Sequence, residues 1–244
     1  MKYIKFGTHT GEENMRIDSD LLDKAIENQT QEPIFRLYAW SPKCVSLGRN
    51  QGAGVNTSNN INENSFKDID VVRRVTGGRA LLHDNEITYS YISPASTIPN
   101  GQTIKESYKY ISGILIDFFK TLGVELDFGG NNTKPSPLEG EGARRAGEGL
   151  KNNKISTHHD YCMLISTGAD VCYNGKKIIG SAQYRKNGYI LQHGSILFGY
   201  DKDLLEELFH EEVSPDSITT VNEILPQLTK EEFVEKFEKF IQKL

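Results

Sequence analysis

The chain has 244 residues, of which 37% are hydrophobic and 25% are charged, as expected for a globular protein with one large core. No run approaches the roughly 18 apolar residues that a membrane span requires, and the first residues lack the apolar core of a secretory signal. The formal net charge of -5, with acidic residues concentrated after Asp201, excludes the strongly basic surface of a typical nucleic-acid-binding protein. We therefore expect a cytoplasmic protein with one domain over residues 1–244 that binds neither membranes nor nucleic acid.

Hydrophobic spacing first predicts a helix over residues 17–26, with Asn14 or Asp18 as its N-cap. A longer helix over residues 104–122 repeats apolar residues every three or four positions and ends before Gly123. Alternation of apolar and polar residues predicts a strand at 34–40, and enrichment in Thr, Tyr and Ile predicts one at 87–92. Short strands are also expected at 45–47, 71–75 and 124–128.

A Gly- and Glu-rich segment, residues 129–154, has no apolar periodicity, which predicts a long exposed loop inserted into the domain. A hairpin turn is expected at Asn174-Gly175. Residues 201–244 form an acidic segment whose spacing predicts helices. Strands are also expected at 168–173, 177–181 and 189–198. Strands and helices in mixed order predict an α+β fold, with mixed or antiparallel sheets flanked by helices.

An arginine-rich turn follows the predicted strand at 71–75 and has the sequence Arg73-Arg74-Val75-Thr76-Gly77-Gly78-Arg79-Ala80-Leu81-Leu82-His83-Asp84. The glycine pair allows the backbone to approach a ligand closely. Arginine side chains are fixed donors for carboxylate or phosphate groups. The motif indicates either a ligand-binding turn or a surface turn with solvated arginines.

The three cysteines are too few, and odd in number, for a disulfide framework, so each is a buried small hydrophobe or a reactive thiol. Cys44 and Cys172 stand among apolar neighbours and fit the first alternative. Cys162 follows the polar segment 156–160, which makes it the most accessible of the three.

Cys162 and Lys177 together are a candidate catalytic pair, because a nearby ammonium favours the nucleophilic thiolate form of a cysteine. The predicted hairpin places Lys177 opposite Val171 or Cys172, with Cys162 further along the same side. A buried structural role for Cys162 is the alternative.

Two further groups of residues have weaker signals. His158, His159 and Cys162 supply three of the four ligands of a structural zinc site; otherwise one histidine is a base for Cys162, or both are solvated. The tracts Gly180-Ser181-Ala182-Gln183 and Gln192-His193-Gly194-Ser195-Ile196 place small and hydrogen-bonding residues on neighbouring strands. They indicate either a narrow pocket for a carbonyl oxygen or cross-strand packing.

Taken in order, these motifs resemble those of the lipoate–biotin protein ligase superfamily. The turn at 73–84 resembles its signature, and Ser46-Leu47-Gly48-x-x-Gln51 is similar to the upstream motif of its lipoate branch. Gly175-Lys176-Lys177-Ile178-Ile179-Gly180-Ser181-Ala182-Gln183 resembles the segment with the family's lysine. Cys162 stands where the ligase-like octanoyltransferases of this superfamily place their nucleophile.

The resemblance implies transfer of an octanoyl or lipoyl group from acyl carrier protein to a lysine of a lipoyl domain or a glycine-cleavage carrier protein. Cys162 and Lys177 are then catalytic, and no metal or cofactor is needed. The implied substrate-binding residues are Arg73, Gly77, Gly78, Arg79, His83, Gly180, Ser181, Ala182, His193 and Gly194.

Three alternatives remain open at this point. An ATP-dependent lipoate ligase would require ATP and magnesium and would be indifferent to Cys162. A lipoyl amidotransferase would keep Cys162 but take its acyl group from an acylated carrier protein. A non-enzymatic module would bind carrier proteins without turnover.

Overall fold

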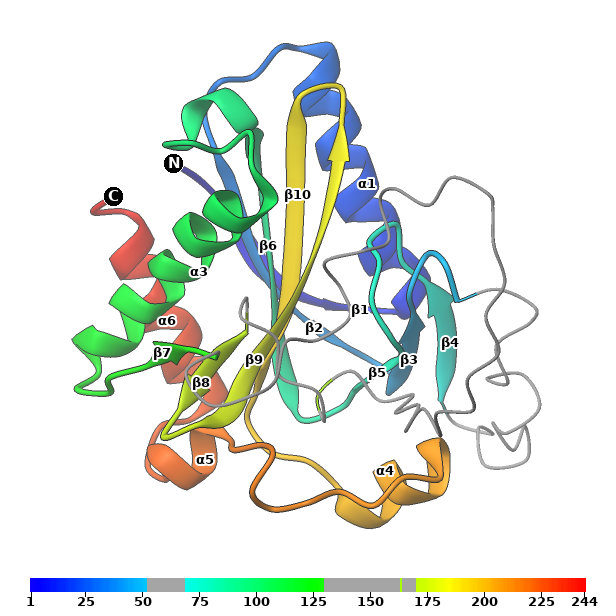
Figure 1. Cartoon of the computed structure of the whole chain (residues 1–244). Helices are drawn as coiled ribbons and strands as arrows, with labels where there is room; N and C mark the ends of the chain where they lie inside the picture. Colours follow the sequence, from blue (N-terminus) through cyan, green and yellow to red (C-terminus); the bar gives the residue numbers. More distant parts are fainter. Residues whose placement is uncertain (52–68, 130–162, 164–169) are drawn as a thin grey trace, which may run out of the picture.

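The computed structural model describes residues 1–51, 69–129, 163 and 170–244 (Figure 1). Its strands are β1 (Lys2–His9), β2 (Ile34–Trp40), β3 (Cys44–Leu47), β4 (Asp70–Arg73), β5 (Leu81–His83), β6 (Glu86–Pro94), β7 (Asp127–Phe128), β8 (Val171–Tyr173), β9 (Lys176–Lys186) and β10 (Tyr189–Leu197). Its helices are α1 (Gly11–Glu27), the short η2 (Ala95–Thr97), α3 (Ile104–Thr121), α4 (Lys202–Phe209), α5 (Val221–Ile224) and α6 (Lys230–Ile241).

Two mixed sheets organise these elements. The larger has seven strands in the order β1-β2-β6-β10-β9-β8-β7, and the smaller has three in the order β4-β3-β5. In the larger sheet β1 pairs with β2 in parallel, and the other pairs are antiparallel. In the smaller sheet β3 is parallel to β4 and antiparallel to β5. The expected α+β fold with mixed sheets is confirmed.

The seven-stranded sheet has helices on both faces (Figure 1). Helices α3 and α6 pack on one face, where buried aromatic side chains such as Phe35, Phe118 and Phe237 form the main core. Helix α1 packs on the other face through Leu22 and Ala25. The small sheet lies beside α1, and the space between the two sheets becomes the site described below.

Helix α1 begins earlier than its hydrophobic spacing predicts. Thr10 is the N-cap: its side chain accepts a hydrogen bond from the backbone of Glu13, and the Glu13 carboxylate accepts one from the Thr10 backbone. The prediction of Asn14 or Asp18 as the cap is therefore wrong. Both residues are buried inside the helix, where their side chains bind other groups instead of the helix end.

Turn residues set the register of the central strands. Asn174 and Gly175 both have positive φ, as the predicted two-residue hairpin requires, and Cys172 pairs with Lys177 across it. A second such turn, Asn187-Gly188, joins β9 to β10. The predicted end of α3 before Gly123 is also confirmed, since that glycine has a φ of 80°.

Several strand assignments differ from the prediction, and β9 extends to Lys186 beyond the predicted end at residue 181. The strand expected at 124–128 is reduced to Asp127–Phe128, because only these residues find partners on β8. Strands β1 and β5 were not predicted, and each is an edge strand whose partner lies far away in the sequence. The predicted loop at 129–154 lies outside the described residues, except for Gly129.

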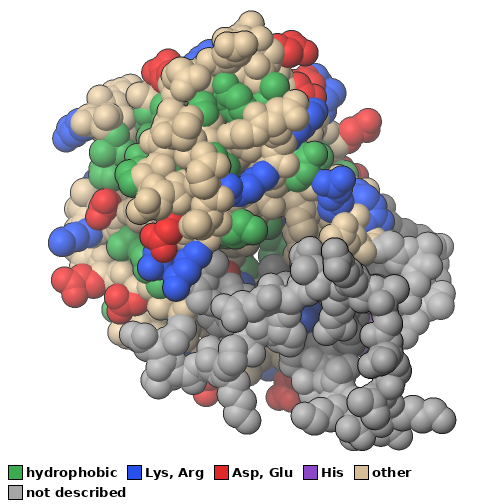
Figure 2. All heavy atoms as spheres, turned by 45° about the horizontal axis from the view of Figure 1, so that its top comes forward, with side chains coloured by type: hydrophobic (Ala, Val, Ile, Leu, Met, Phe, Trp, Pro, Cys, Tyr) green, Lys and Arg blue, Asp and Glu red, His purple; other side chains and the backbone are tan. Residues whose placement is uncertain are grey.

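Among the described residues, no helix is both long and apolar enough to cross a membrane. On the face shown in Figure 2, Lys and Arg side chains are interspersed with Asp and Glu side chains over the described part of the surface.

Candidate active site

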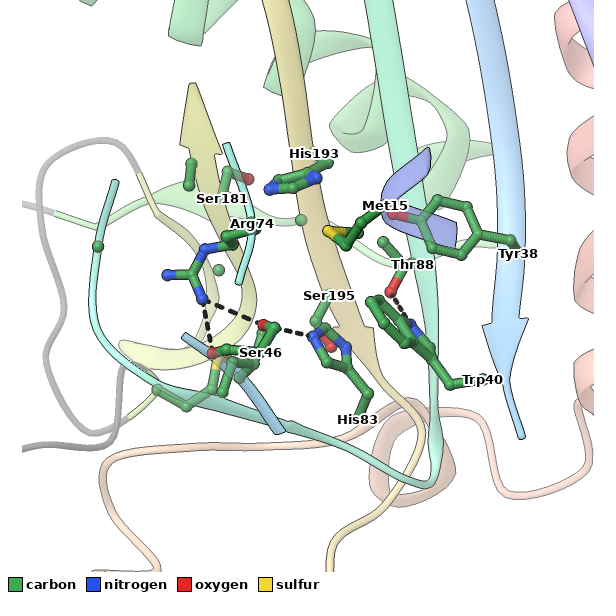
Figure 3. A pocket seen from close by; sticks show the side chains of 16 residues that line it. Met15, Tyr38, Trp40, Ser46, Arg74, His83, Thr88, Ser181, His193 and Ser195 are labelled. Carbon is green, nitrogen blue, oxygen red and sulfur yellow. Dashed lines mark hydrogen bonds between the residues drawn. The ribbon is translucent and has the colours of Figure 1, made fainter. Parts of the chain in front are cut away.

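A cavity opens between the two sheets (Figure 3). Its walls come from the middle of the large sheet, from β3 and β5, and from the Gly77-Gly78 turn. The lining residues are Met15, Tyr38, Trp40, Ser46, Arg74, Gly78, Leu81, His83, Thr88, Met163, Gly180, Ser181, Ala182, His193, Gly194 and Ser195.

Arg74 holds the glycine turn in place and is almost fully buried. Its Nη1 donates to the carbonyl oxygen of Ser46 at 2.8 Å, and its Nη2 donates to the carbonyl oxygens of Gly77 at 2.9 Å and Arg79 at 2.6 Å. A Cβ on Gly48 would lie 1.9 Å from the Gly78 carbonyl oxygen, so the turn packs directly on this glycine. The arginine-rich motif therefore shapes the cavity wall through its backbone.

His83 lies at the bottom of the cavity, stacked on Trp40 with ring centroids 3.9 Å apart (Figure 3). Its Nδ1 is 3.3 Å from Glu86 Oε1, and its Nε2 is 2.8 Å from Ser46 Oγ. Burial lowers the pKa of His83 in spite of the nearby Glu86, so the ring is neutral at neutral pH. A proton on Nδ1 satisfies the carboxylate, which leaves Nε2 to accept a hydrogen bond from Ser46.

Glu86 is a buried carboxylate that sequence reasoning did not assign to the site. Thr88 Oγ1 donates to it at 2.8 Å and Ser195 Oγ at 2.6 Å, and Trp40 Nε1 in turn donates to Thr88 Oγ1 at 2.8 Å. These bonds compensate for burying a charged group. Because the hydroxyl groups of Thr88 and Ser195 both donate to Glu86, their protons are not available to a ligand in the cavity.

Asp18 of α1 is the centre of a second buried cluster. Its Oδ1 accepts hydrogen bonds from Arg36 Nη1 at 2.8 Å and Ser90 Oγ at 2.9 Å. Its Oδ2 accepts one from Tyr38 OH at 2.9 Å and lies 3.5 Å from His193 Nδ1. Burial acts to raise the pKa of Asp18, but His193 and Arg36 outweigh it, and this pKa is below its ordinary value. The cluster therefore places a paired negative charge beside the His193 ring, whose Nδ1 makes no hydrogen bond within the described part of the structure.

Lys177 is buried, with 1% exposure, and its Nζ lies 3.1 Å from Asp170 Oδ2. Its side chain runs beneath Gly180, where an added Cβ would lie 3.0 Å from Lys177 Cε and 2.7 Å from Met163 Sδ. Lys177 is thus close to Met163, a buried cavity residue. Cys162, the preceding residue in the sequence, lies outside the described residues.

The structure brings most of the expected substrate-binding residues to this cavity, namely Gly78, His83, Gly180, Ser181, Ala182, His193 and Gly194. Arg73 and Arg79 are not among the lining residues; Arg73 is exposed and donates to the Gly48 carbonyl oxygen at 2.9 Å. Gly77 lies in a neighbouring groove with Tyr108 and Tyr184. Arg74, the second arginine of the motif, takes the place that Arg73 was expected to fill.

The described residues contain no group of three or more His, Cys, Asp or Glu side chains arranged to hold a metal ion. His158 and His159, which the sequence offered as metal ligands or bases, lie outside the described residues.

The fold is shared with solved structures of lipoate-protein ligases. A crystal structure of lipoate-protein ligase A bound with ATP has a TM-score of 0.68 at 19% identity, covering 99% of this chain and 84% of the other. A structure from an analysis of the bipartite lipoate protein ligase of Thermoplasma acidophilum and its E2 lipoyl domain has a TM-score of 0.63 at 18% identity, covering 100% of this chain and 84% of the other.

The sequence comparison makes the assignment specific. The model of the Lipoyl protein ligase A/B catalytic domain matches residues 10–242, and the chain belongs to this family. Octanoyltransferase LipM of Macrococcus caseolyticus is 37% identical over 197 residues, which cover 80% of this chain and 65% of that protein. Octanoyltransferase LipM of Staphylococcus epidermidis is 35% identical over 234 residues, which cover 96% and 75%. The chain thus corresponds to only part of the length of these relatives.

Proposed function

We propose that this protein is an octanoyltransferase of lipoate biosynthesis, which moves an octanoyl group onto a lysine of a carrier protein. The similarity to proteins named octanoyltransferase, at 35% identity over nearly the whole chain, is the observation that carries the proposal. The buried Lys177 beside Met163, which directly follows Cys162, supports a covalent route with Cys162 as nucleophile.

The first half-reaction forms an acyl-enzyme. The Cys162 thiolate, favoured by the Lys177 ammonium, adds to the carbonyl carbon of an octanoyl thioester. A new carbon–sulfur bond forms, the bond to the donor sulfur breaks, and the donor leaves as a thiolate that takes up a proton. Acyl carrier protein is the expected donor.

The second half-reaction transfers the group to nitrogen. The neutral amine of the acceptor lysine adds to the same carbonyl carbon, an amide bond forms, and the bond to Cys162 breaks. The amine loses one proton, which restores the cysteine thiol. Lipoyl domains or a glycine-cleavage carrier protein are the expected acceptors, and the sequence of steps predicts ping-pong kinetics without ATP or a metal ion.

The cavity suits the acyl chain because Met15, Trp40, Leu81 and Met163 supply apolar surface along its walls. Burial of a methylene group contributes about 0.8 kcal/mol, so an eight-carbon chain gains several kcal/mol from such walls. The glycine turn at Gly78 and the neutral His83 ring add uncharged surface to the wall. The guanidinium of Arg74, which also lines the cavity, donates to the backbone carbonyl oxygens of Ser46, Gly77 and Arg79.

A second function is supported by one observation. The ATP-bound lipoate-protein ligase A shares the fold over 99% of this chain. An ATP-dependent ligase would activate free octanoate or lipoate and would not use Cys162. A lipoyl amidotransferase is the third candidate function, after the octanoyltransferase and the ligase.

Intact-mass spectrometry with octanoyl-acyl carrier protein, in the absence of ATP, separates these functions. We expect wild-type protein to gain one octanoyl group that hydroxylamine releases, and the Cys162→Ala variant to gain none. Cys44→Ala is the matched control, since Cys44 is buried and its pKa is raised to about 12. Modification of the acceptor only when ATP is supplied, with full activity in Cys162→Ala, would establish the ligase instead.

A further inference from the structure

A chain of side-chain hydrogen bonds runs from the surface at Arg185 to the cavity at Ser181. Arg185 Nε contacts Gln183 Oε1 at 2.9 Å, and Gln183 Nε2 contacts Gln192 Oε1 at 3.0 Å. Gln192 Nε2 contacts Tyr89 OH at 2.8 Å, and Tyr89 OH contacts Ser181 Oγ at 2.7 Å. Tyr89 and Gln192 have no exposed surface, so bulk water does not complete their hydrogen bonds.

Arg185 determines which atom donates in each of these hydrogen bonds, because a guanidinium group only donates. The Gln183 oxygen must face Arg185, which turns its amide nitrogen toward Gln192. Gln192 then accepts through its oxygen and presents its own amide nitrogen to Tyr89. The orientation of each amide thus follows from the bond before it.

This series of hydrogen bonds reaches the cavity at Ser181. The 2.7 Å contact between Tyr89 OH and Ser181 Oγ allows either oxygen to donate. Because Tyr89 OH already accepts from Gln192, we take its own proton to go to Ser181 Oγ. Burial raises the pKa of Tyr89 to about 12, so the phenol keeps its proton at neutral pH. Among the described residues Tyr89 is the only hydrogen-bond partner of the Ser181 hydroxyl, which leaves the proton of Ser181 for an acceptor in the cavity.

The other hydroxyl groups that line the cavity are already committed as donors. Tyr38 OH donates to Asp18, while Thr88 and Ser195 donate to Glu86. Ser46 Oγ accepts from Arg74 Nη1 at 3.1 Å, and its proton goes to the unprotonated Nε2 of His83. The Ser181 hydroxyl therefore differs from the other hydroxyl groups that line the cavity. It accepts a hydrogen bond from Tyr89, and its own proton is available to a ligand.

We propose that the Ser181 hydroxyl donates a hydrogen bond to the carbonyl oxygen of the bound acyl group, and that Tyr89 and Gln192 are positioning residues that fix its direction. This inference rests on the proposed function in taking the ligand to be an acyl group. Charge grows on that oxygen when a nucleophile adds to the carbonyl carbon, so a fixed donor there stabilises the transition state more than the substrate.

Four variants test which atoms donate in this series of hydrogen bonds, as well as whether the series matters. Ser181→Ala removes the donor, and Tyr89→Phe removes the hydroxyl that positions it. Gln192→Glu replaces the amide nitrogen with an acceptor of the same shape, so Tyr89 would donate to it, and Ser181 would then donate to Tyr89. Tyr91→Phe is the matched control, because it deletes a buried tyrosine hydroxyl two residues away on the same strand, outside the chain.

The first readout does not depend on acyl transfer: the ¹³C NMR shift of [1-¹³C]octanamide bound to each variant. We expect the carbonyl signal to lie downfield in wild type and Tyr91→Phe, and to move upfield in Ser181→Ala and Gln192→Glu. The second readout is the rate of acyl-enzyme formation from octanoyl-acyl carrier protein. We expect losses of about 10²-fold in Ser181→Ala and Gln192→Glu, and about 10-fold in Tyr89→Phe.

The two hypotheses fail differently. A wild type that transfers no acyl group, but shows the Ser181-dependent carbonyl shift, would overturn the proposed function and keep the inference. Equal shifts and rates in wild type, Ser181→Ala and Tyr89→Phe would overturn the inference and keep the function. Failure of wild type to bind the amide overturns the inference as well. Because the charged Gln192→Glu variant is at risk of misfolding, Ser181→Ala and Tyr89→Phe suffice for these outcomes.

Discussion

The two faces of the seven-stranded sheet are built from the same strands and serve different purposes. On the α3 and α6 face, Phe35, Leu37 and Ile87 enter the main apolar core. On the opposite face, the alternate positions hold polar side chains that are just as deeply buried: Arg36, Tyr38, Thr88, Ser90, His193 and Ser195. Because side chains alternate along a strand, one stretch of sequence stabilises the fold on one face and builds a site on the other.

The difference lies in how each face is held together. Apolar contacts on the helix face are non-directional and tolerate repacking. The polar face depends on hydrogen bonds and paired charges around Asp18 and Glu86, in which every partner must be present. Buried polar groups give little net stability, so their concentration beside a cavity is better explained by function than by folding.

The largest effect we expect comes from Lys177→Met, which removes the ammonium group from the cavity side while keeping an unbranched side chain. If Lys177 supports the Cys162 thiolate and the proton transfers of acyl exchange, octanoyl transfer falls by about 10³-fold. Steady-state transfer to an apo lipoyl domain measures this loss. Lys176→Met is the control, because this neighbour is partly exposed and binds the Pro215 carbonyl oxygen. Equal losses in both variants would contradict the assignment.

Phe237→Ala probes the helix face with the next largest effect. Phe237 is fully buried between Phe35 and Phe118, with ring centroids 4.9 and 4.8 Å away. We expect a loss of about 3–5 kcal/mol in the free energy of unfolding, measured by urea denaturation, because the truncation leaves a cavity in an aromatic cluster. The transfer rate of the folded fraction should stay near wild type. The partly buried Phe240 gives a matched comparison, and a large drop in transfer rate for Phe237→Ala would show that the two faces are coupled.

The sequence predicts local structure on both faces, because local structure depends on neighbours. The hairpin at Asn174-Gly175 fixed the register that pairs Cys172 with Lys177, and this prediction is confirmed. Alternation of apolar and polar residues predicted the strand at 34–40, but it did not indicate that a polar position such as Arg36 is buried.

Long-range partners on the polar face were not predictable in this way. Asp18 was expected to cap a helix, but it binds Arg36 on another element, and no spacing rule relates the two positions. Nothing in the sequence marked Glu86 as a buried site residue, because a glutamate before a strand is usually exposed. Arg73 and Arg74 were indistinguishable in the sequence, and only the path of β4 decides that Arg74 turns inward. The roles of Cys162, His158 and His159 stay predictions.

His83 gives the smallest expected effect and tests whether the polar face is tuned to neutral pH. Its pKa in the folded protein lies below the ordinary 6.5, chiefly because of burial. As pH falls through 6.5, the unfolded chain therefore takes up a proton that the folded protein refuses, and stability decreases until the lowered folded-state pKa is reached. His83→Asn removes this proton uptake. We expect wild type to lose about 1 kcal/mol more than the variant between pH 7.5 and pH 5 in urea denaturation. Equal losses would mean that His83 takes up its proton as readily in the folded protein as in the unfolded chain. At pH 5 its hydrogen bond from Ser46 would then have to reverse. That reversal would release the Ser46 proton into the cavity and remove the distinction between Ser46 and Ser181 as donors.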